Sequence, residues 1–422
     1  MMNKLLVIAD DLTGAIDTGA QFSKKGVPSL VLMAEQLSFD GIDGVDCLVV
    51  DTESRHLPGE EARRIVAGVT ANALAHGFRH FYKKTDSALR GNIGAELAGL
   101  LEAGGDTCLT FVPAFPKIRR ATRNGIHYID DVEVGQSVFS KDPFTPVTLS
   151  SVADIIRLQT GVMTENITSD AYEKAALMPE KKTIRILDAE SVADLESIGA
   201  QLKRGNNLNL LAGCAGFAEI LPELLDLPAR ELKWERSAGN ILVISGSVNP
   251  ITVEQLAYGE QSGFSAFTLS DEQKLDESYP DSDACGGFAR RVADELERTG
   301  RVIVRAAENA AEAAQLTRGG KEKNAINELS RRVADSIGEI TLRILSRAQV
   351  GSLAIFGGDT LHGVLSKIGG GGVIPLNELS PGVVAAKIVS DLHSGIIITK
   401  SGGLGDKDVL RRIEEFVFGE LP

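Results

Sequence analysis

The chain is 422 residues long, with 43% hydrophobic residues, 24% charged residues and a formal net charge of −14. This length accommodates two domains with sizeable cores, and the composition is that of an ordinary globular protein. The acidic balance argues against a general nucleic-acid binder, so an anionic ligand would have to be held by a local group of cations.

Neither the apolar runs nor the cysteines indicate a membrane or secreted protein. No apolar run approaches the roughly 20 residues that span a bilayer, and residues 5–9 are better interpreted as a buried strand than as a signal peptide. The four cysteines are widely spaced and three stand in apolar runs, which favours buried free thiols over disulfides. No CxxC or paired His spacing indicates zinc. We therefore expect a cytoplasmic protein without a membrane or nucleic-acid partner.

Short apolar runs that end in polar or glycine-rich turns recur along the chain, each followed by a helical pattern. In chain order these runs include residues 5–9, 47–50, 81–82, 108–112, 184–187, 208–212, 241–244, 302–304, 353–356 and 396–398. Apolar strands that alternate with helices predict parallel sheets covered on both faces. Ligands in such folds bind beyond the carboxyl ends of the strands. The expected fold is α/β, with two domains that are each a mostly parallel sheet flanked by helices.

A change of composition near residues 229–240 marks the expected domain boundary. The only tryptophan, Trp234, lies there in a charged, turn-like stretch between two apolar runs. We therefore expect domains at residues 1–232 and 238–422. Dense polar motifs stand in the first domain and glycine-bearing turns in the second.

The first apolar run leads into an acidic turn, Asp-Asp-Leu-Thr-Gly-Ala-Ile-Asp at residues 10–17. Asp or Thr at this place can cap a helix, but two adjacent acids with a third at Asp17 exceed what capping requires. We expect Asp11 to bind substrate hydroxyls, or this group to help hold Mg²⁺. Arg55, at the end of the next apolar run, is a candidate clamp for a carboxylate.

The strongest signal is the segment Lys-Lys-Thr-Asp-Ser-Ala-Leu-Arg-Gly-Asn at residues 83–92. It is typical of a pocket for a small anionic, hydroxylated substrate, although a charged loop capped by serine is the structural alternative. Arginine offers a planar fork to a carboxylate, lysine offers a point charge, and aspartate accepts a hydroxyl. The substrate-binding candidates here are Lys84, Thr85, Asp86, Ser87 and Arg90. Asp86 is the candidate to orient and deprotonate an attacking hydroxyl, with Asp11 as the alternative.

The segment 119–128 has the pattern of a β-hairpin, with Asn124-Gly125 at its turn. His127, which follows the turn, either contacts the substrate or packs inside the domain.

Three strand ends in the second half carry glycine turns: Ser247 follows one strand, Gly357 to Thr360 follow another, and Gly402 and Gly403 follow a third. A strand, a glycine turn and a helix N-terminus together form an anion site. The predicted nucleotide-binding residues are Ser247, Gly357, Gly358, Asp359, Thr360, Gly402 and Gly403. No turn has the GxxxxGK[ST] spacing or a clean GxGxxG, which disfavours a Walker ATPase and a Rossmann dehydrogenase.

Taken together, these motifs resemble the four-carbon acid sugar kinase family, formerly a domain of unknown function, over essentially the whole chain. The matching motifs are Asp-Asp-Leu-Thr-Gly-Ala at 10–15, Lys-Thr-Asp-Ser-Ala-Leu-Arg-Gly-Asn at 84–92, Arg-x-Thr-x-x-Gly at 120–125, Gly-Ser-Val-x-Pro-x-Thr at 246–252, Gly-Gly-Asp-Thr at 357–360, Pro-Gly-Val at 381–383 and Lys-Ser-Gly-Gly-x-Gly at 400–405. The resemblance implies an N-terminal acid-sugar domain, a C-terminal ATP domain and an active site in the cleft between them.

The activity implied by the resemblance is ATP-dependent phosphorylation of the terminal hydroxyl of a four-carbon sugar acid. D-threonate is the expected substrate, while D-erythronate, L-threonate and 3-oxo-tetronate remain open. ATP and Mg²⁺ are the expected cofactors, with Asp359 as an oxygen ligand for the metal. The alternatives from other classes are a nucleotide-dependent hydroxy-acid oxidoreductase and a non-catalytic sensor of sugar acids. The sequence does not fix the oligomeric state, for which a homodimer is one option.

Overall fold

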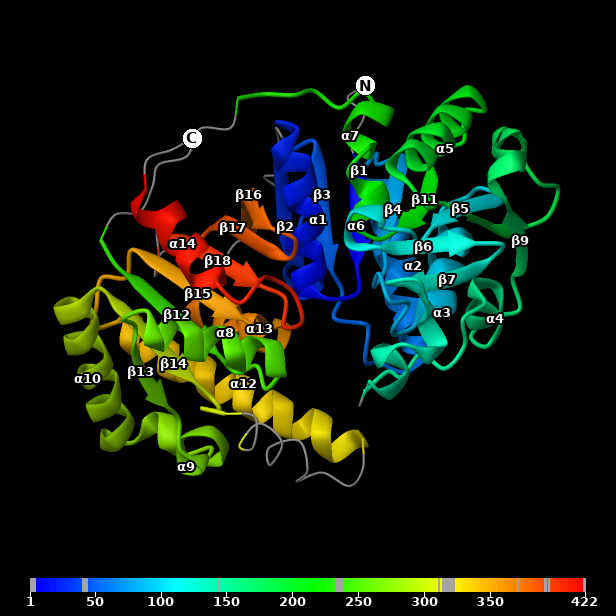
Figure 1. The fold of residues 1–422 in the computed structure, drawn as a ribbon. Helices are drawn as coiled ribbons and strands as arrows, with labels where there is room; N and C mark the ends of the chain where they lie inside the picture. Colours follow the sequence, from blue (N-terminus) through cyan, green and yellow to red (C-terminus); the bar gives the residue numbers. More distant parts are fainter. Residues whose placement is uncertain are drawn as a thin grey trace. The chain divides into compact units, whose positions relative to one another are not determined.

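The computed structural model of the chain comprises two compact units, Met1–Leu232 (unit 1) and Lys233–Pro422 (unit 2) (Figure 1). The structure describes residues 5–39, 45–142, 144–231, 239–309, 312, 323–369, 372–390, 393 and 395–419. The expected boundary at residues 232–238, with Trp234, lies outside the described residues.

Unit 1 is built on a parallel sheet whose described strands have the order β2-β3-β1-β4-β11-β5-β10-β9. Their bounds are β1 (Leu5–Ala9), β2 (Ser29–Met33), β3 (Cys47–Asp51), β4 (His80–Lys84), β5 (Cys108–Val112), β9 (Met163–Ile167), β10 (Thr183–Leu187) and β11 (Leu210–Gly213). Strand β1 reads Leu-Leu-Val-Ile-Ala and is buried throughout, as a central strand covered on both faces must be.

Helices cover both faces of this sheet. Their bounds are α1 (Leu12–Lys24), α2 (Gly59–Ala75), α3 (Ile93–Ala103), α4 (Val152–Arg157), α5 (Val192–Arg204), α6 (Ala215–Ala218) and α7 (Leu221–Leu224), with short 3₁₀ turns η1 (Ala34–Gln36), η2 (Pro116–Ile118), η3 (Val134–Gln136), η4 (Val138–Lys141) and η5 (Ser169–Ala176). Helices α2, α3 and α4 pack in one group, and α1, α5, α6 and α7 in another. Because crossovers between parallel strands are right-handed, the two groups lie on opposite faces.

A small antiparallel sheet, β6 (Arg120–Arg123), β7 (Ile126–Ile129) and β8 (Val132–Glu133), accompanies unit 1. Arg123 pairs with Ile126, so the hairpin turn consists of Asn124 and Gly125 alone. Both turn residues have positive φ, 49° and 74°, which a two-residue turn of this kind requires. The predicted hairpin is therefore confirmed.

Unit 2 has a second sheet, whose described strands have the order β13-β14-β12-β15-β18-β17-β16. The bounds are β12 (Ile241–Ser245), β13 (Ser265–Thr268), β14 (Arg301–Arg305), β15 (Ser352–Phe356), β16 (Val373–Ser380), β17 (Val383–Ile388) and β18 (Ile396–Lys400). The first five strands in the sheet are parallel, and β17 runs antiparallel to both β18 and β16. The sheet is thus mostly parallel, as expected.

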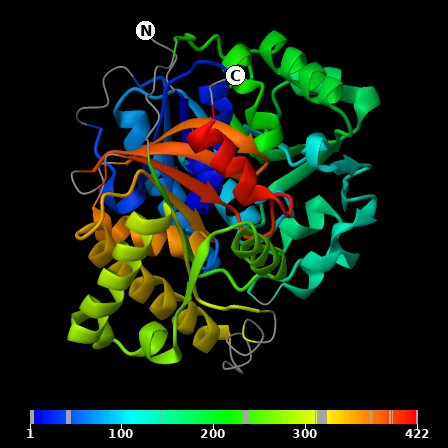
Figure 2. The same ribbon diagram turned by 60° about the vertical axis from the view of Figure 1, so that its left-hand side comes forward.

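The helices of unit 2 are α8 (Pro250–Gln261), α9 (Asp271–Leu275), α10 (Asp283–Thr299), α12 (Lys323–Leu345), α13 (Gly358–Ile368) and α14 (Val409–Phe418), with η6 (Tyr279–Asp281). Helix α14 packs on α8, whereas α12 packs on α9, α10 and α13. Figure 2 shows α14, in red, against the orange strands of its own unit, where Ile413 joins Val383 and Ile398 in one apolar core.

The structure confirms the predicted α/β class, with mostly parallel sheets and helices around them. The cysteines Cys47, Cys108, Cys214 and Cys285 are all buried and free, as expected. Within the described residues, no helix combines the length and the apolar character needed to cross a membrane.

Candidate functional site

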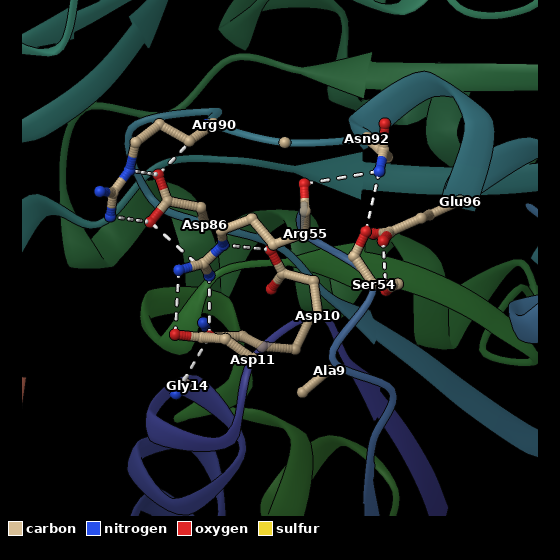
Figure 3. A network of polar contacts seen from close by, with 12 residues as sticks. Ala9, Asp10, Asp11, Gly14, Ser54, Arg55, Asp86, Arg90, Asn92 and Glu96 are labelled. Carbon is tan, nitrogen blue, oxygen red and sulfur yellow. Dashed lines mark hydrogen bonds and ion pairs between the residues drawn. The ribbon is translucent and has the colours of Figure 1, made fainter. Parts of the chain in front are cut away.

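The acid-bearing turns of unit 1 lie at one edge of its sheet because β3, β1 and β4 are parallel neighbours in register. Ala9, the last residue of β1, is aligned with Asp51 on one side and Lys84 on the other. The residues that follow each strand therefore emerge together (Figure 3). Chain segments separated by more than 40 positions meet in this way.

Arg55 is paired with two carboxylates of the turn after β1. Its Nε donates to Asp10 Oδ2 at 2.7 Å, and its Nη1 and Nη2 donate to Asp11 Oδ2 and Oδ1 at 2.9 and 2.7 Å. The Asp10 side chain is 1% exposed and that of Arg55 is 11% exposed. Burial alone would raise the pKa of Asp10, but Arg55 together with nearby lysines lowers it, so Asp10 is a carboxylate.

Asp86 is fixed by its own turn. Its Oδ2 accepts from the backbone N–H groups of Ala88 and Arg90 at 3.0 and 3.2 Å, and Arg90 Nη2 donates to Oδ1 at 2.9 Å. Arg55 Nη2 lies 3.9 Å from the same Oδ1, which links the two acidic turns. Burial opposes ionisation, but Arg90 and Arg55 hold the pKa of Asp86 well below its usual range. Asp86 is therefore an ionised acceptor at neutral pH.

Several groups in the cluster have unused bonding capacity. Thr85 Oγ1 and Asp10 Oδ1 are buried and have no hydrogen-bond partner among the described residues. The Lys84 side chain is also buried, at 5% exposure, and no described carboxylate lies within ion-pair distance of it. A Cβ at Gly14 would lie 2.9 Å from Lys84 Nζ and 2.4 Å from Asp11 Oδ1. Glycine at that position leaves room for both the Lys84 ammonium and the Asp11 carboxylate.

Arg120 reaches the cluster from the hairpin, where it begins β6. Its Nη1 donates to Ser87 Oγ, and its guanidinium lies 5.3 Å from the centre of the Phe139 ring. Arg90 lies on the same ring at 5.2 Å. Arg55 and Arg90 are each neutralised by aspartates, whereas no described carboxylate forms an ion pair with Arg120. Arg120 and Lys84 are thus the two cations of the cluster that lack a carboxylate partner in the described structure.

A second buried ion pair, between Lys83 and Glu96, lies beside the cluster. Lys83 Nζ lies 3.0 Å from Glu96 Oε2, and both side chains are at most 1% exposed. Ser54 donates to the other Glu96 oxygen at 2.5 Å, and Lys83 donates to the carbonyl of Lys84 at 2.7 Å. These contacts anchor the backbone beside Arg55 and Lys84, and Asn92 Nδ2 adds a bond to the Ser54 carbonyl at 2.8 Å.

His127 packs inside the unit, which favours the packing role among the two that the sequence left open. It is completely buried, with Nδ1 3.0 Å from Thr122 Oγ1 and Nε2 3.0 Å from the Ser87 carbonyl. Burial, together with the nearby Arg120 charge, lowers the pKa of His127 to about 4. It therefore stays neutral and holds Ser87 in place.

This burial predicts an acid-sensitive fold. The unfolded chain protonates His127 below about pH 6.5, whereas the folded chain does so only near pH 4. The stability contributed by neutral His127 is therefore complete above about pH 6.5 and is lost, up to about 3 kcal/mol, as the pH falls to about 4. In urea unfolding at about pH 7 and about pH 4.5, His127→Gln should lose less stability on acidification than wild type. Equal losses in the two proteins would contradict this assignment.

In unit 2 the three predicted turns also meet at one sheet edge, since β12, β15 and β18 are parallel neighbours. The backbone N–H of Gly246 donates to Thr360 Oγ1 at 3.0 Å. A Cβ on Gly357 would lie 3.4 Å from Ser247 Cβ, and one on Gly402 would lie 3.5 Å from Ser247 Oγ. Gly357 has φ 109°, a conformation open mainly to glycine. The turns thus lie together at one edge of the sheet, beside the N-terminus of α13.

The structure places all the predicted residues in two groups: Asp11, Arg55, Lys84, Thr85, Asp86, Ser87 and Arg90 in unit 1, and Ser247, Gly357, Gly358, Asp359, Thr360, Gly402 and Gly403 in unit 2. Sequence reasoning did not select Asp10, Arg120 or Lys400 as site residues, although each stands in a motif it identified. Whether these three residues lie near the candidate sites depends on which strands are neighbours in the sheets, which the sequence does not give. Among the described residues no cluster of three or more His, Cys, Asp or Glu side chains could hold a metal ion.

Comparison with known proteins gives the chain a family. A family model described as a sugar-binding N-terminal domain matches residues 5–221, and one described as a nucleotide-binding C-terminal domain matches residues 242–410. The chain is 29% identical to a D-threonate kinase of Salmonella typhimurium, over 99% of this chain and 100% of the relative. It is 30% identical to a D-erythronate kinase of Heliobacterium modesticaldum, over 96% of this chain and 95% of the relative.

A 3-oxo-tetronate kinase of Burkholderia multivorans is 28% identical, over 95% of this chain and 94% of the relative. The fold is similar to the crystal structure of a protein from Salmonella typhimurium LT2, with a TM-score of 0.81, 22% identity and coverage of 98% of this chain and 100% of that one. The relatives named here are all kinases, so they give no support to the oxidoreductase alternative. The two matched domains and these full-length relatives show that the chain is a sugar-acid kinase and belongs to the four-carbon acid sugar kinase family.

Proposed function

We propose that this kinase transfers the γ-phosphoryl group of ATP to the terminal 4-hydroxyl of D-threonate, giving D-threonate 4-phosphate. The observation that carries the proposal is the unit 1 cluster, which combines unneutralised cations with ionised acceptors at one sheet edge. Such a set suits a small molecule that bears both a carboxylate and hydroxyls. D-erythronate, L-threonate and 3-oxo-tetronate are the alternative substrates, since relatives that act on three different acids are similarly distant.

In this proposal the charge of each unit 1 residue determines which part of the substrate it binds. Lys84 and Arg120 bind the carboxylate of the acid, because their charges are not already neutralised by described aspartates. Thr85, Ser87 and Asp11 bind its hydroxyls. Arg55 and Arg90 hold Asp11 and Asp86 in position. Asp86, which is ionised, accepts the hydrogen bond of the attacking hydroxyl and takes its proton late in the transfer.

The unit 2 turns are proposed to bind ATP, with Ser247, Gly357 to Thr360, Gly402 and Gly403 around its phosphates. Backbone N–H groups at the start of α13 face that edge and favour anions. Mg²⁺ in kinases needs only one or two protein carboxylates in addition to phosphate oxygens. Asp359 is exposed in the first turn of α13 and fits that role. When bound, the ion would neutralise charge that builds up on the phosphates.

The test is release of ADP in the presence of Mg²⁺ and ATP, measured against threonate and erythronate in both enantiomeric series and 3-oxo-tetronate. The proposal expects D-threonate to give the highest kcat/KM, at about 10⁴ M⁻¹s⁻¹ or above. A higher value for another acid would replace the substrate and keep the class. If no acid stimulates ADP release, the sensor alternative becomes the better account.

The carboxylate-binding role of Lys84 makes a separate prediction. In Lys84→Met the charge is lost and the chain length is kept, so KM for the acid should rise about 10–100-fold while KM for ATP is unchanged. Lys117→Met is the matched control, because Lys117 is a lysine of the same unit that is 55% exposed and paired with Glu219. Kinetics with each substrate varied in turn provide the measurement. An unchanged KM for the acid in Lys84→Met would remove Lys84 from the binding site.

A further inference from the structure

Lys400, the last residue of β18, is a buried lysine enclosed by neutral oxygen atoms. Burial lowers the pKa of its ammonium to about 7, but three carbonyls and one hydroxyl around Nζ suit the three-donor ammonium form. Its side chain is 1% exposed, and its Nζ donates to the carbonyls of Ser401, Gly402 and Leu404 at 3.0, 3.2 and 3.0 Å. Thr252 Oγ1, on α8, lies 3.2 Å away and Nζ stands 5.3 Å from the centre of the Phe356 ring. In the described part of unit 2, no carboxylate forms an ion pair with it. Carbonyl and hydroxyl oxygens around one positive charge resemble the surroundings of a dehydrated monovalent cation.

The turn that follows Lys400, residues 401–406, is also held by Gln255 on α8. Its Nε2 donates to the carbonyls of Leu404, Gly405 and Asp406 at 3.3, 2.8 and 3.0 Å. The hydroxyl of Thr252 donates to the Gly402 carbonyl at 2.7 Å. In the turn of residues 401–406, the carbonyls of Ser401, Gly402, Leu404, Gly405 and Asp406 therefore point inward, toward Lys400 and α8.

The inward carbonyls fix where the amide groups point. In a planar trans peptide the C=O of one residue and the N–H of the next point in opposite directions. Because the carbonyls of Ser401 and Gly402 face Lys400, the N–H groups of Gly402 and Gly403 face away from it. Neither N–H donates to any residue that the structure describes, and both glycines are partly or fully exposed. They lie beside Ser247 and Asn249, at the edge assigned above to the phosphates.

We propose that Lys400 is a positioning residue, a tethered monovalent cation that keeps the 401–406 turn with its carbonyls inward and its Gly402 and Gly403 amides directed at the nucleotide phosphates. The inference rests on the proposed nucleotide role of this turn. Without the ammonium, several carbonyl dipoles would converge on an uncharged space and repel one another. The turn would then rotate its peptides and withdraw the amide donors from the phosphates.

The experiment is chemical rescue of Lys400→Ala, followed by direct calorimetric binding of ADP as well as by kinetics. The truncation leaves room for a small cation, so nucleotide affinity should fall by about tenfold or more. Adding K⁺ or NH₄⁺ should recover most of it, while KM for the acid stays constant. Li⁺, which holds its water more tightly, should recover less. Lys407→Ala is the matched control, since Lys407 lies just beyond the same turn and is 59% exposed in a surface pair with Glu254.

Lys400→Met tests the same idea without a cavity. It should lose nucleotide affinity to a similar extent and show no rescue, because its side chain occupies the cation position. Unchanged ADP affinity in both variants, or a loss in Lys400→Ala that no cation reverses, would overturn the role of Lys400. Failure of the wild-type protein to bind ADP would instead refute the proposed function on which this inference depends.

Discussion

Asp86→Asn should lower kcat by about 10²- to 10⁴-fold while leaving nucleotide binding to unit 2 unchanged. The substitution keeps the shape of the side chain and removes the charge that accepts the attacking hydroxyl. The Asp86 carboxylate is held by two backbone N–H groups and by Arg90. An amide oxygen in the Oδ2 position can still accept from the two backbone N–H groups, but the amide NH₂ in the Oδ1 position cannot accept from Arg90 Nη2. A loss of turnover larger than that of a control that also perturbs Arg90 would then report the lost charge and basicity.

Asp142→Asn is the matched control for this experiment. Asp142 Oδ2 accepts from Arg90 Nη1 at 3.2 Å, so its substitution perturbs Arg90 as Asp86→Asn does but leaves the acceptor in place. We expect a loss below about tenfold for the control. If Asp86→Asn keeps near-normal turnover, Asp86 is not the base, and Asp11→Asn becomes the variant to measure.

Arg55→Met should destabilise unit 1 by about 3–5 kcal/mol, because it leaves Asp10 buried without its cation. Arg63→Met is the matched control, since Arg63 also pairs with two carboxylates but at the surface, with 37% of its side chain exposed. Its loss should cost no more than about 1 kcal/mol. Hydrogen exchange of the amides in β1, β3 and β4 measures the difference locally and does not require the whole chain to unfold in one step.

The stability difference between wild type and Arg55→Met should depend on pH, in a direction set by the pKa of Asp10. The folded-state pKa of Asp10 is lowered, so the stability from its ionised form is present above its unfolded pKa of about 3.9 and is lost as the pH falls through the lower folded value. The gap between wild type and Arg55→Met should therefore narrow in acid. A small stability difference between wild type and Arg55→Met at neutral pH would contradict this prediction, because it would show that water or a rearrangement compensates the buried charge of Asp10.

The fold could be predicted from the sequence because strand and helix patterns alternate cleanly. Buried runs such as Leu5–Ala9 end in polar turns, and this pattern predicts both groups of candidate residues at strand ends. The Asn124-Gly125 pair predicted the hairpin because this turn needs positive φ at two successive residues, which few residue types other than Asn and Gly adopt. Each of these features depends on residues that are neighbours in the sequence, so each can be recognised from the sequence alone.

The pairings inside the site could not be predicted, because they depend on strand order. Arg55 meets Asp10 and Asp11 only because β3 lies beside β1. The sequence therefore indicated Arg55 as a clamp for the substrate carboxylate, whereas the structure shows it occupied by aspartates. In the same way Arg120 reaches Ser87 across 33 positions, and the surroundings of Lys400 depend on how one turn folds back on its own strand.

The most direct test of the central claim is the ³¹P NMR spectrum of the product formed from ATP and D-threonate. Transfer to the terminal hydroxyl places phosphorus next to a CH₂ group, so the account predicts a phosphomonoester signal split into a triplet by the two protons on C4. A doublet would place the phosphoryl group on a secondary hydroxyl, and an unsplit, hydroxylamine-sensitive signal would place it on the carboxylate. Either result, or no new phosphorus signal, would contradict the account.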